Sequence, residues 1–126
     1  MSENDHWIGV DLDGTLAEYS DWQGIEHIGN ALPPMIERVK SWLAEGKRVK
    51  IFTARVTKGP EAVRFIHQWL VAQGLPVLEV TNIKDFDMLE LWDDRCVSVV
   101  TNTGLPCSEY YSDVIENIEE EKNEER

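Results

Sequence analysis

Apolar residues gather in short blocks along the chain, and five of these blocks predict strands. Residues 7–12, WIGVDL, form an apolar run that ends in an acid, and residues 48–53, RVKIFT, alternate into a second run. Blocks rich in β-branched residues or leucine follow at 77–81, 89–93 and 97–101. Short apolar runs of this composition are typical of strands that are buried in a sheet.

Helical spacing of apolar residues predicts three helices, at 33–45, at 60–73 and near 108–120. The first two begin at proline and are followed by glycine, which are the residues favoured at those helix ends. Strands and helices therefore alternate through most of the chain. This order predicts an α/β fold with a central parallel sheet and helices on both faces. We expect one domain over residues 1–118 and an acidic tail at 119–126.

Composition narrows the function classes. The chain has 126 residues and a formal net charge of -12. Such an excess of negative charge repels nucleic acid backbones, which argues against a general DNA or RNA binder, but a local site can still bind a small phosphorylated substrate. No apolar run approaches the roughly 20 residues of a membrane span, so we expect no membrane partner and a cytoplasmic location.

Polar residues suited to catalysis follow four of the predicted strands: Asp11, Asp13, Thr53, Arg55, Lys84, Asp93 and Asp94. Ligands of open α/β sheets bind outside the carboxyl ends of the parallel strands. The topology therefore predicts that these carboxylates, a hydroxyl and cationic side chains converge at one edge of the sheet.

The segment 11–15, DLDGT, carries the most specific chemistry. Gly14 lets the backbone turn sharply, so the Asp11 side chain and the Asp13 carbonyl can share a metal while the Asp13 side chain points at substrate. One carboxylate could attack phosphorus, and the other could act as general acid and then base. Mg²⁺ suits such a site because it binds carboxylates, water and substrate phosphate, so we expect it as the cofactor.

The remaining polar residues have supporting roles in this hypothesis. Asp93 or Asp94 supplies a further metal ligand, and the sequence does not rank them. Thr53 donates a hydrogen bond to phosphate and Lys84 neutralises its charge. Arg55 is left open between a phosphate contact and an ion pair. The residues expected around the substrate phosphate are Asp13, Gly14, Thr53, Ala54, Arg55 and Lys84.

These motifs resemble those of the haloacid dehalogenase (HAD) superfamily. DLDGT is similar to its first motif, Thr53 in IFTAR to the second, Lys84 in TNIKD to the third and the acid pair in LWDDR to the fourth, in the same order. The resemblance implies a Rossmann-like three-layer fold with strand order 5-4-1-2-3. It also implies Asp11 as a nucleophile that forms an aspartyl-phosphate, and Asp13 as the acid/base.

The intervals between the motifs indicate a member without a cap domain. A helix and a strand fill the chain between Asp13 and Thr53, and again between Thr53 and Lys84. Residues 16–32 resemble the squiggle-and-flap segment of the superfamily and carry Tyr19, Trp22 and His27, although the role of this segment stays open.

The sequence thus predicts a Mg²⁺-dependent phosphomonoester hydrolase whose substrate could be a nucleotide or a sugar phosphate. The alternative is a non-hydrolytic phosphate-binding or scaffold module that keeps the same site. A calcium loop is disfavoured because Leu16 stands where such a loop needs glycine. An open site is compatible with a homo-oligomer, but neither the oligomeric state nor the substrate follows from the sequence.

Overall fold

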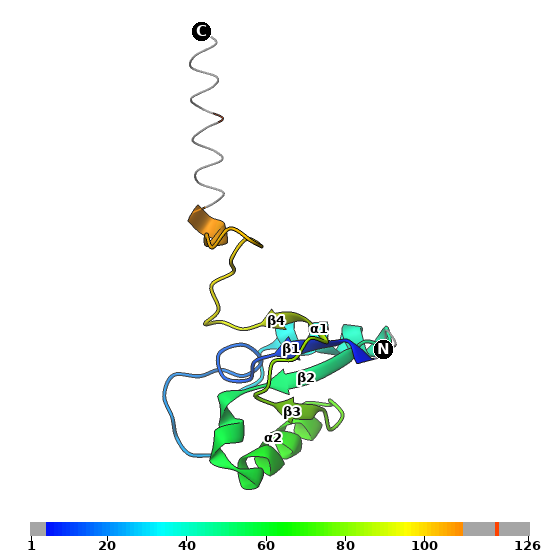
Figure 1. Ribbon diagram of the computed structural model, residues 1–126. Helices are drawn as coiled ribbons and strands as arrows, with labels where there is room; N and C mark the ends of the chain where they lie inside the picture. Colours follow the sequence, from blue (N-terminus) through cyan, green and yellow to red (C-terminus); the bar gives the residue numbers. More distant parts are fainter. Residues whose placement is uncertain (1–4, 110–117, 119–126) are drawn as a thin grey trace. The chain divides into compact units, whose positions relative to one another are not determined.

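The computed structural model describes residues 5–109 and residue 118, and its first compact unit is residues 1–94. Four parallel strands form one sheet in this unit: β1 (Trp7–Val10), β2 (Arg48–Phe52), β3 (Glu79–Thr81) and β4 (Met88–Trp92). Their order is β3-β2-β1-β4, so β1 lies between β2 and β4 (Figure 1). The prediction of an α/β fold with a parallel sheet is confirmed.

The order of the strands differs from the predicted 5-4-1-2-3. Read from its other edge, the observed sheet is 4-1-2-3, so four strands keep their expected neighbours. No fifth strand forms within residues 5–109. The predicted strand at 97–101 contributes only an isolated bridge between Val99 and Pro106, and two of its three valines, Val97 and Val99, are exposed.

Two α-helices accompany the strands, α1 (Pro33–Ala44) and α2 (Pro60–Ala72). Both start with proline, whose missing N–H costs nothing in the first helical turn. Both end just before a glycine with positive φ, Gly46 at 83° and Gly74 at 80°. A short 3₁₀ helix, η2 (Ala54–Lys58), links β2 to α2. None of the described helices has the length and apolar character needed to cross a membrane.

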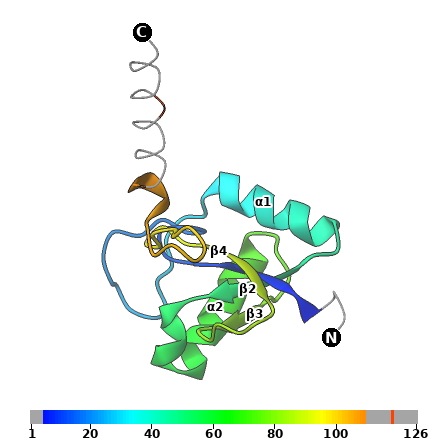
Figure 2. The ribbon, with the colours of Figure 1, turned by 45° about the horizontal axis from the view of Figure 1, so that its top comes forward.

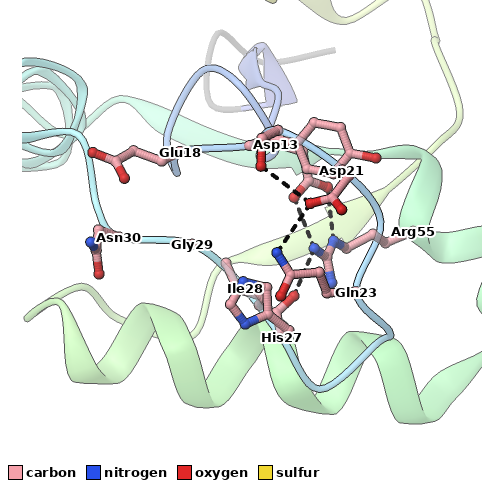
Figure 3. Close-up of a pocket in the computed structure, with 11 residues that line it drawn as sticks. Asp13, Glu18, Asp21, Gln23, His27, Ile28, Gly29, Asn30 and Arg55 are labelled. Atoms are coloured by element: carbon pink, nitrogen blue, oxygen red, sulfur yellow. Dashed lines mark hydrogen bonds and ion pairs between the residues drawn. The ribbon is translucent and has the colours of Figure 1, made fainter.

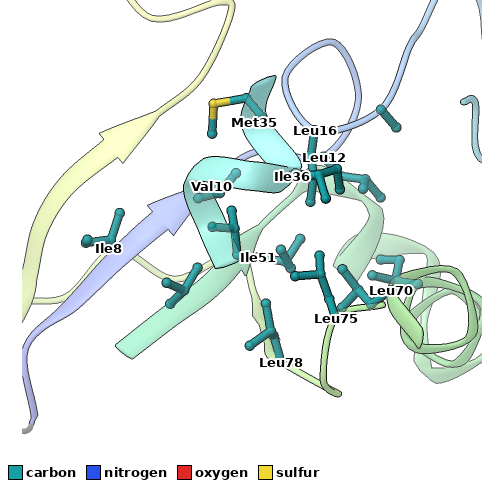
Figure 4. Close-up of a cluster of buried hydrophobic side chains, with 14 of the residues drawn as sticks. Ile8, Val10, Leu12, Leu16, Met35, Ile36, Ile51, Leu70, Leu75 and Leu78 are labelled. Carbon is teal, nitrogen blue, oxygen red and sulfur yellow. The ribbon is translucent and has the colours of Figure 1, made fainter. Parts of the chain in front are cut away.

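Both α-helices pack on the same face of the sheet. Ile8 and Val10 of β1 and the alternate residues Val49 and Ile51 of β2 are buried in one apolar cluster (Figure 4). The apolar stripes of the two helices enter this same cluster: Met35, Ile36, Val39, Trp42, Ile66 and Leu70. Burying a large aliphatic side chain stabilises the fold by about 1.5–3 kcal/mol, so this cluster fixes the sheet and its helices together. Figure 2 shows α1 as a layer beside the strands.

The opposite face lacks a helix among the described residues of the first unit, so the expectation of helices on both faces is wrong for this part of the chain. The connection from β3 to β4 is an extended loop, and it covers this face at Trp7. The Trp7 indole donates to the Asp85 carboxylate at 2.9 Å, and the Trp7 backbone N–H donates to the Asp87 carbonyl at 3.0 Å. A connection of so few residues has no room for a helix.

The second compact unit spans residues 95–126. Its described part is a tight turn in which the Val100 N–H donates to the Leu105 carbonyl and the Cys107 N–H donates to the Ser98 carbonyl. Residues 107–109 and residue 118 are helical. The rest of the helix predicted near 108–120, and the predicted tail at 119–126, lie outside the described residues. The boundary predicted for the domain at residue 118 therefore stays a prediction.

Candidate functional site

The carboxyl ends of three neighbouring strands bring the predicted site residues together. Asp11 follows β1 and its N–H donates to the Trp92 carbonyl of β4 at 2.9 Å. Thr53 follows β2 and Asp93 follows β4, on either side of β1 in the sheet. The chain after β1 extends beyond these strand ends in Figure 1. Parallel pairing therefore places an acid, a hydroxyl and a second acid at one edge.

Three carboxylates meet at this edge. Oxygen atoms of Asp11, Asp93 and Asp94 all lie within 4.8 Å of one another. The hydroxyl of Thr15 anchors Asp94, because it accepts from the Asp94 N–H at 3.0 Å and donates to an Asp94 carboxylate oxygen at 3.3 Å. Asp94 is exposed whereas Asp11 and Asp93 are half-buried. The two acids of the LWDDR motif thus both reach Asp11.

A compact turn after β1 sets the direction of the Asp11 and Asp13 side chains. The Leu12 carbonyl accepts from the N–H groups of Leu16 and Ala17, at 3.0 and 2.9 Å, and the Leu12 and Leu16 side chains are fully buried. Gly14 has a φ of 90°, and a Cβ at this position would lie 2.3 Å from an Asp94 carboxylate oxygen. Glycine is therefore required here both for the backbone conformation and for the close approach of Asp94.

Asp11 is an acid that its surroundings make hard to ionise. Burial, followed by the charge of Asp93 and the hydrogen bond and charge of Asp94, together raise the pKa of its carboxyl group from 3.8 to about 7. A hydrogen bond from the Leu12 backbone opposes this shift. The arrangement gathers negative charge that a cation would neutralise.

The donor set fits a hard divalent cation. All three side chains offer carboxylate oxygens, which are the ligands that Mg²⁺ prefers, and the exposed Asp94 leaves one side open to water or substrate. Burial and, after it, the carboxylates of Asp93 and Asp94 raise the pKa of Asp11, and a bound cation would oppose this shift.

The Asp13 side chain takes a different direction and forms an ion pair with Arg55. The Nε and an Nη of Arg55 donate to the two Asp13 carboxylate oxygens, each at 2.8 Å. The Arg55 side chain is 4% exposed and that of Asp13 is 20% exposed. This two-pronged geometry is the strong form of a carboxylate–guanidinium contact. Of the two readings of Arg55 left open above, the structure supports the ion pair.

Arg55 also contacts the segment after β1, residues 18–30, which we call the flap. One Nη donates to the His27 carbonyl at 2.9 Å and the other to the Ile25 carbonyl at 3.4 Å. Its guanidinium carbon lies 4.9 Å from the centre of the Trp22 ring. The Arg55 N–H donates to the Thr53 hydroxyl at 3.1 Å, so Thr53, the predicted phosphate ligand, caps η2 and is buried.

Backbone pairing closes the base of the flap. The Glu18 N–H donates to the Asn30 carbonyl at 2.8 Å and the Leu32 N–H to the Leu16 carbonyl at 2.9 Å. The Trp69 indole of α2 donates to the Gly29 carbonyl at 3.0 Å. The base is therefore closed on itself and bound to α2, while the part of the flap beyond it contacts Arg55 and, at Trp22, also Lys58.

A pocket of about 430 Å³ lies between the flap, Asp13 and Arg55. Figure 3 shows Arg55 pointing at Asp13 on one side and at the His27 backbone on the other. Flap residues supply most of its lining: Glu18, Tyr19, Ser20, Asp21, Gln23, His27, Ile28, Gly29 and Asn30. Its volume falls within the range of pockets that take small molecules.

Lys84 does not share the contacts that join the other predicted site residues to one another. It is exposed in the β3–β4 loop, and no hydrogen bond or ion pair of Lys84 occurs within the described part of the chain. Its neighbour Asp85 binds the Trp7 indole, and Trp7 is the first residue of β1, opposite the acids. Ala54 begins η2 and its carbonyl accepts from the Thr57 hydroxyl at 2.8 Å. The phosphate contacts expected of Gly14, Thr53, Ala54 and Lys84 stay predictions.

Comparisons with known proteins establish the fold only. No protein-family model matches the chain, and no curated protein matches it. The structure is similar to that of a conserved protein from Bacteroides thetaiotaomicron, with a TM-score of 0.57 over 88% of this chain and 89% of that one. The two sequences are 22% identical over this match. The shared feature is an α/β fold.

Proposed function

We propose that this chain is a Mg²⁺-dependent phosphomonoester hydrolase of the HAD type, with Asp11 as nucleophile and Asp13 as general acid and base. The observation that carries the proposal is the meeting of Asp11, Asp93 and Asp94 at the carboxyl edge of a parallel sheet. The ordered motifs around Asp11, Thr53, Lys84 and the Asp93–Asp94 pair support the same assignment.

The proposed reaction has two steps. An Asp11 carboxylate oxygen attacks phosphorus, the ester P–O bond breaks, and Asp13 gives its proton to the departing alcohol oxygen. In the second step, the Asp13 carboxylate takes a proton from water, and the water oxygen attacks phosphorus. This releases inorganic phosphate and returns Asp11 to a carboxylate, so protons balance over the cycle.

Asp11, Asp93 and Asp94 would hold the cation, which supplies positive charge near the phosphoryl oxygens when bound. With that charge present, Asp11 can stay ionised at neutral pH despite its raised pKa in the cation-free protein. Thr53 and Lys84 remain the proposed phosphate contacts. The pocket beside Asp13 would receive the alcohol part of the substrate, because Asp13 must reach the leaving oxygen.

One observation favours the non-hydrolytic alternative. Lys84, the only cation expected at the phosphate besides Arg55, makes no hydrogen bond or ion pair within residues 5–109. Arg55 is itself occupied by Asp13. With Lys84 paired to none of the described acids and Arg55 paired to Asp13, the site could hold phosphate without stabilising the charge that develops when an ester is cleaved. Turnover decides between the two functions.

The experiment is phosphate release from a panel of phosphate esters, including nucleotides and sugar phosphates, with Mg²⁺ or with a chelator. We expect release that requires Mg²⁺ and that falls sharply in Asp93→Asn, because this change removes a proposed ligand. Glu37→Gln, an exposed acid on α1, is the matched control and should keep native activity.

Release at the same rate with chelator would contradict the metal role. No release from any ester, together with phosphate binding in a calorimeter, would favour the binding module.

A further inference from the structure

We infer that Arg55 is a positioning residue that couples the flap to Asp13, so that the flap must be in place for Asp13 to be correctly oriented. This inference deepens the proposed function and rests on it for its catalytic consequence. Its structural part, the coupling, can be measured without any turnover.

One guanidinium contacts both Asp13 and the flap. Arg55 donates to both oxygens of Asp13, to two flap carbonyls, at Ile25 and His27, and lies over the flap residue Trp22. Its own side chain is 4% exposed. A buried guanidinium has a fixed planar set of donors, so losing one partner changes the best position for the others.

The contact orients Asp13 without disabling it. A carboxylate has about four lone-pair sites, and Arg55 uses one on each oxygen. The remaining sites can still receive or hold a proton, but their directions are set by the plane of the guanidinium. Lysine could not reproduce this because an ammonium is a point charge without a planar fork.

The flap depends on the same group beyond its base. Its ends are held by backbone pairing near Ala17 and Ala31, and by Trp69 at Gly29. The Ile25 and His27 carbonyls lie further along and both accept from Arg55. Among the residues that the structure describes, Asp13 makes no hydrogen bond or ion pair with Ile25 or His27, whereas Arg55 contacts all three and is therefore the link between them.

The first test is hydrogen exchange over residues 19–30 in native protein and in Asp13→Asn, both without substrate. We expect exchange in this segment to become about tenfold faster in Asp13→Asn, because Arg55 loses the charge that holds it. Exchange within α1 of the same variant is the reference, because a general loss of stability would accelerate both segments. Asp11→Asn is a second control, since Asp11 lies two residues away and makes no contact with Arg55 within the described residues; it should leave exchange in the flap unchanged. Unchanged exchange in Asp13→Asn, or equal acceleration in both variants, would overturn the coupling.

The second test is turnover by Arg55→Lys on the best ester of the panel. We expect kcat to fall about 10²-fold with little change in KM, because a misplaced acid/base slows chemistry more than binding. In Arg55→Ala, added guanidinium should restore part of kcat. Arg64→Met, which removes an exposed arginine paired with Glu61, is the control and should keep native kinetics.

A rise in KM alone, or no rescue by guanidinium, would assign Arg55 to binding or folding and overturn its positioning role. If native protein releases no phosphate, the proposed function fails, while the exchange result still decides whether Arg55 couples the flap to Asp13.

Discussion

Replacing Asp11 by Asn should remove turnover and, in the absence of Mg²⁺, make the protein more stable. An amide does not attack phosphorus as a carboxylate does, so we expect kcat to fall about 10³-fold or more. The same change removes one of three clustered carboxylates; burial of this group and its repulsion by the other two raise the pKa of Asp11 to about 7. Catalysis and stability are thus expected to move in opposite directions.

The pH dependence gives the sign of the stability effect. In the unfolded chain Asp11 loses its proton near its ordinary pKa of 3.8, whereas in the folded protein it keeps the proton until about pH 7. The folded state therefore binds more protons between these values, and this site lowers stability as pH rises from about 4 to about 7. Asp11→Asn removes that loss, so the two proteins should differ most above pH 7.

The measurement is urea unfolding of native protein and Asp11→Asn at pH 5 and pH 8, with chelator and with Mg²⁺. Asp11 is half-buried and partly screened by solvent, so we expect a gain on the order of 1–2 kcal/mol at pH 8 with chelator. Added Mg²⁺ should stabilise the native protein much more than the variant. A less stable Asp11→Asn at pH 8, or equal stabilisation of both proteins by Mg²⁺, would contradict the acid cluster as a metal site.

Replacing Asp13 by Asn should have the opposite effect and destabilise the protein. The variant leaves the Arg55 guanidinium, which is 4% exposed, without its counter-charge. Breaking a buried ion pair from one side costs about 3–5 kcal/mol, and the 20% exposure of Asp13 reduces that cost, so we expect a loss of about 2–4 kcal/mol.

Urea unfolding at pH 7 measures this difference, and Glu61→Gln provides the control. Glu61 also pairs with an arginine, Arg64, but both side chains are more than half exposed. An exposed pair is worth about 0–1 kcal/mol, so this control should unfold almost as the native protein does. Equal effects of the two substitutions would show that burial of Arg55 contributes nothing to the stability of its ion pair with Asp13.

The strands and helices that the sequence predicts correctly are those whose pattern reports burial directly. α1 and α2 each have an apolar stripe at helical spacing with proline at the start, and their observed bounds differ from the prediction by one residue. The segment 97–101 has the β-branched residues of a strand but forms one isolated bridge. Strand composition describes a side chain's preference, whereas a strand also needs a neighbouring strand in register, which the pattern does not specify.

The site residues could be predicted where the end of a strand fixes their position, but not where two side chains distant in the sequence form a contact. Asp11 and Asp93 could be placed together because each directly follows a parallel strand, and neighbouring strands share an edge. The ion pair between Arg55 and Asp13 joins residues 42 positions apart and follows no period. The only sign of this ion pair in the sequence was the position of Arg55, two residues after Thr53 at the end of a strand. That position did not show whether Arg55 binds a phosphate or a carboxylate.

The most direct test of the proposed mechanism is to look for a phosphoryl group on Asp11 during turnover. The protein is mixed with its best ester and Mg²⁺, quenched in acid within the first turnover, and examined by intact mass and peptide mass spectrometry. We expect a transient, hydroxylamine-sensitive phosphoryl group on the peptide that contains Asp11, and no such group in Asp11→Asn. Turnover without any phosphorylated protein, or with the group on another residue, would contradict Asp11 as the nucleophile.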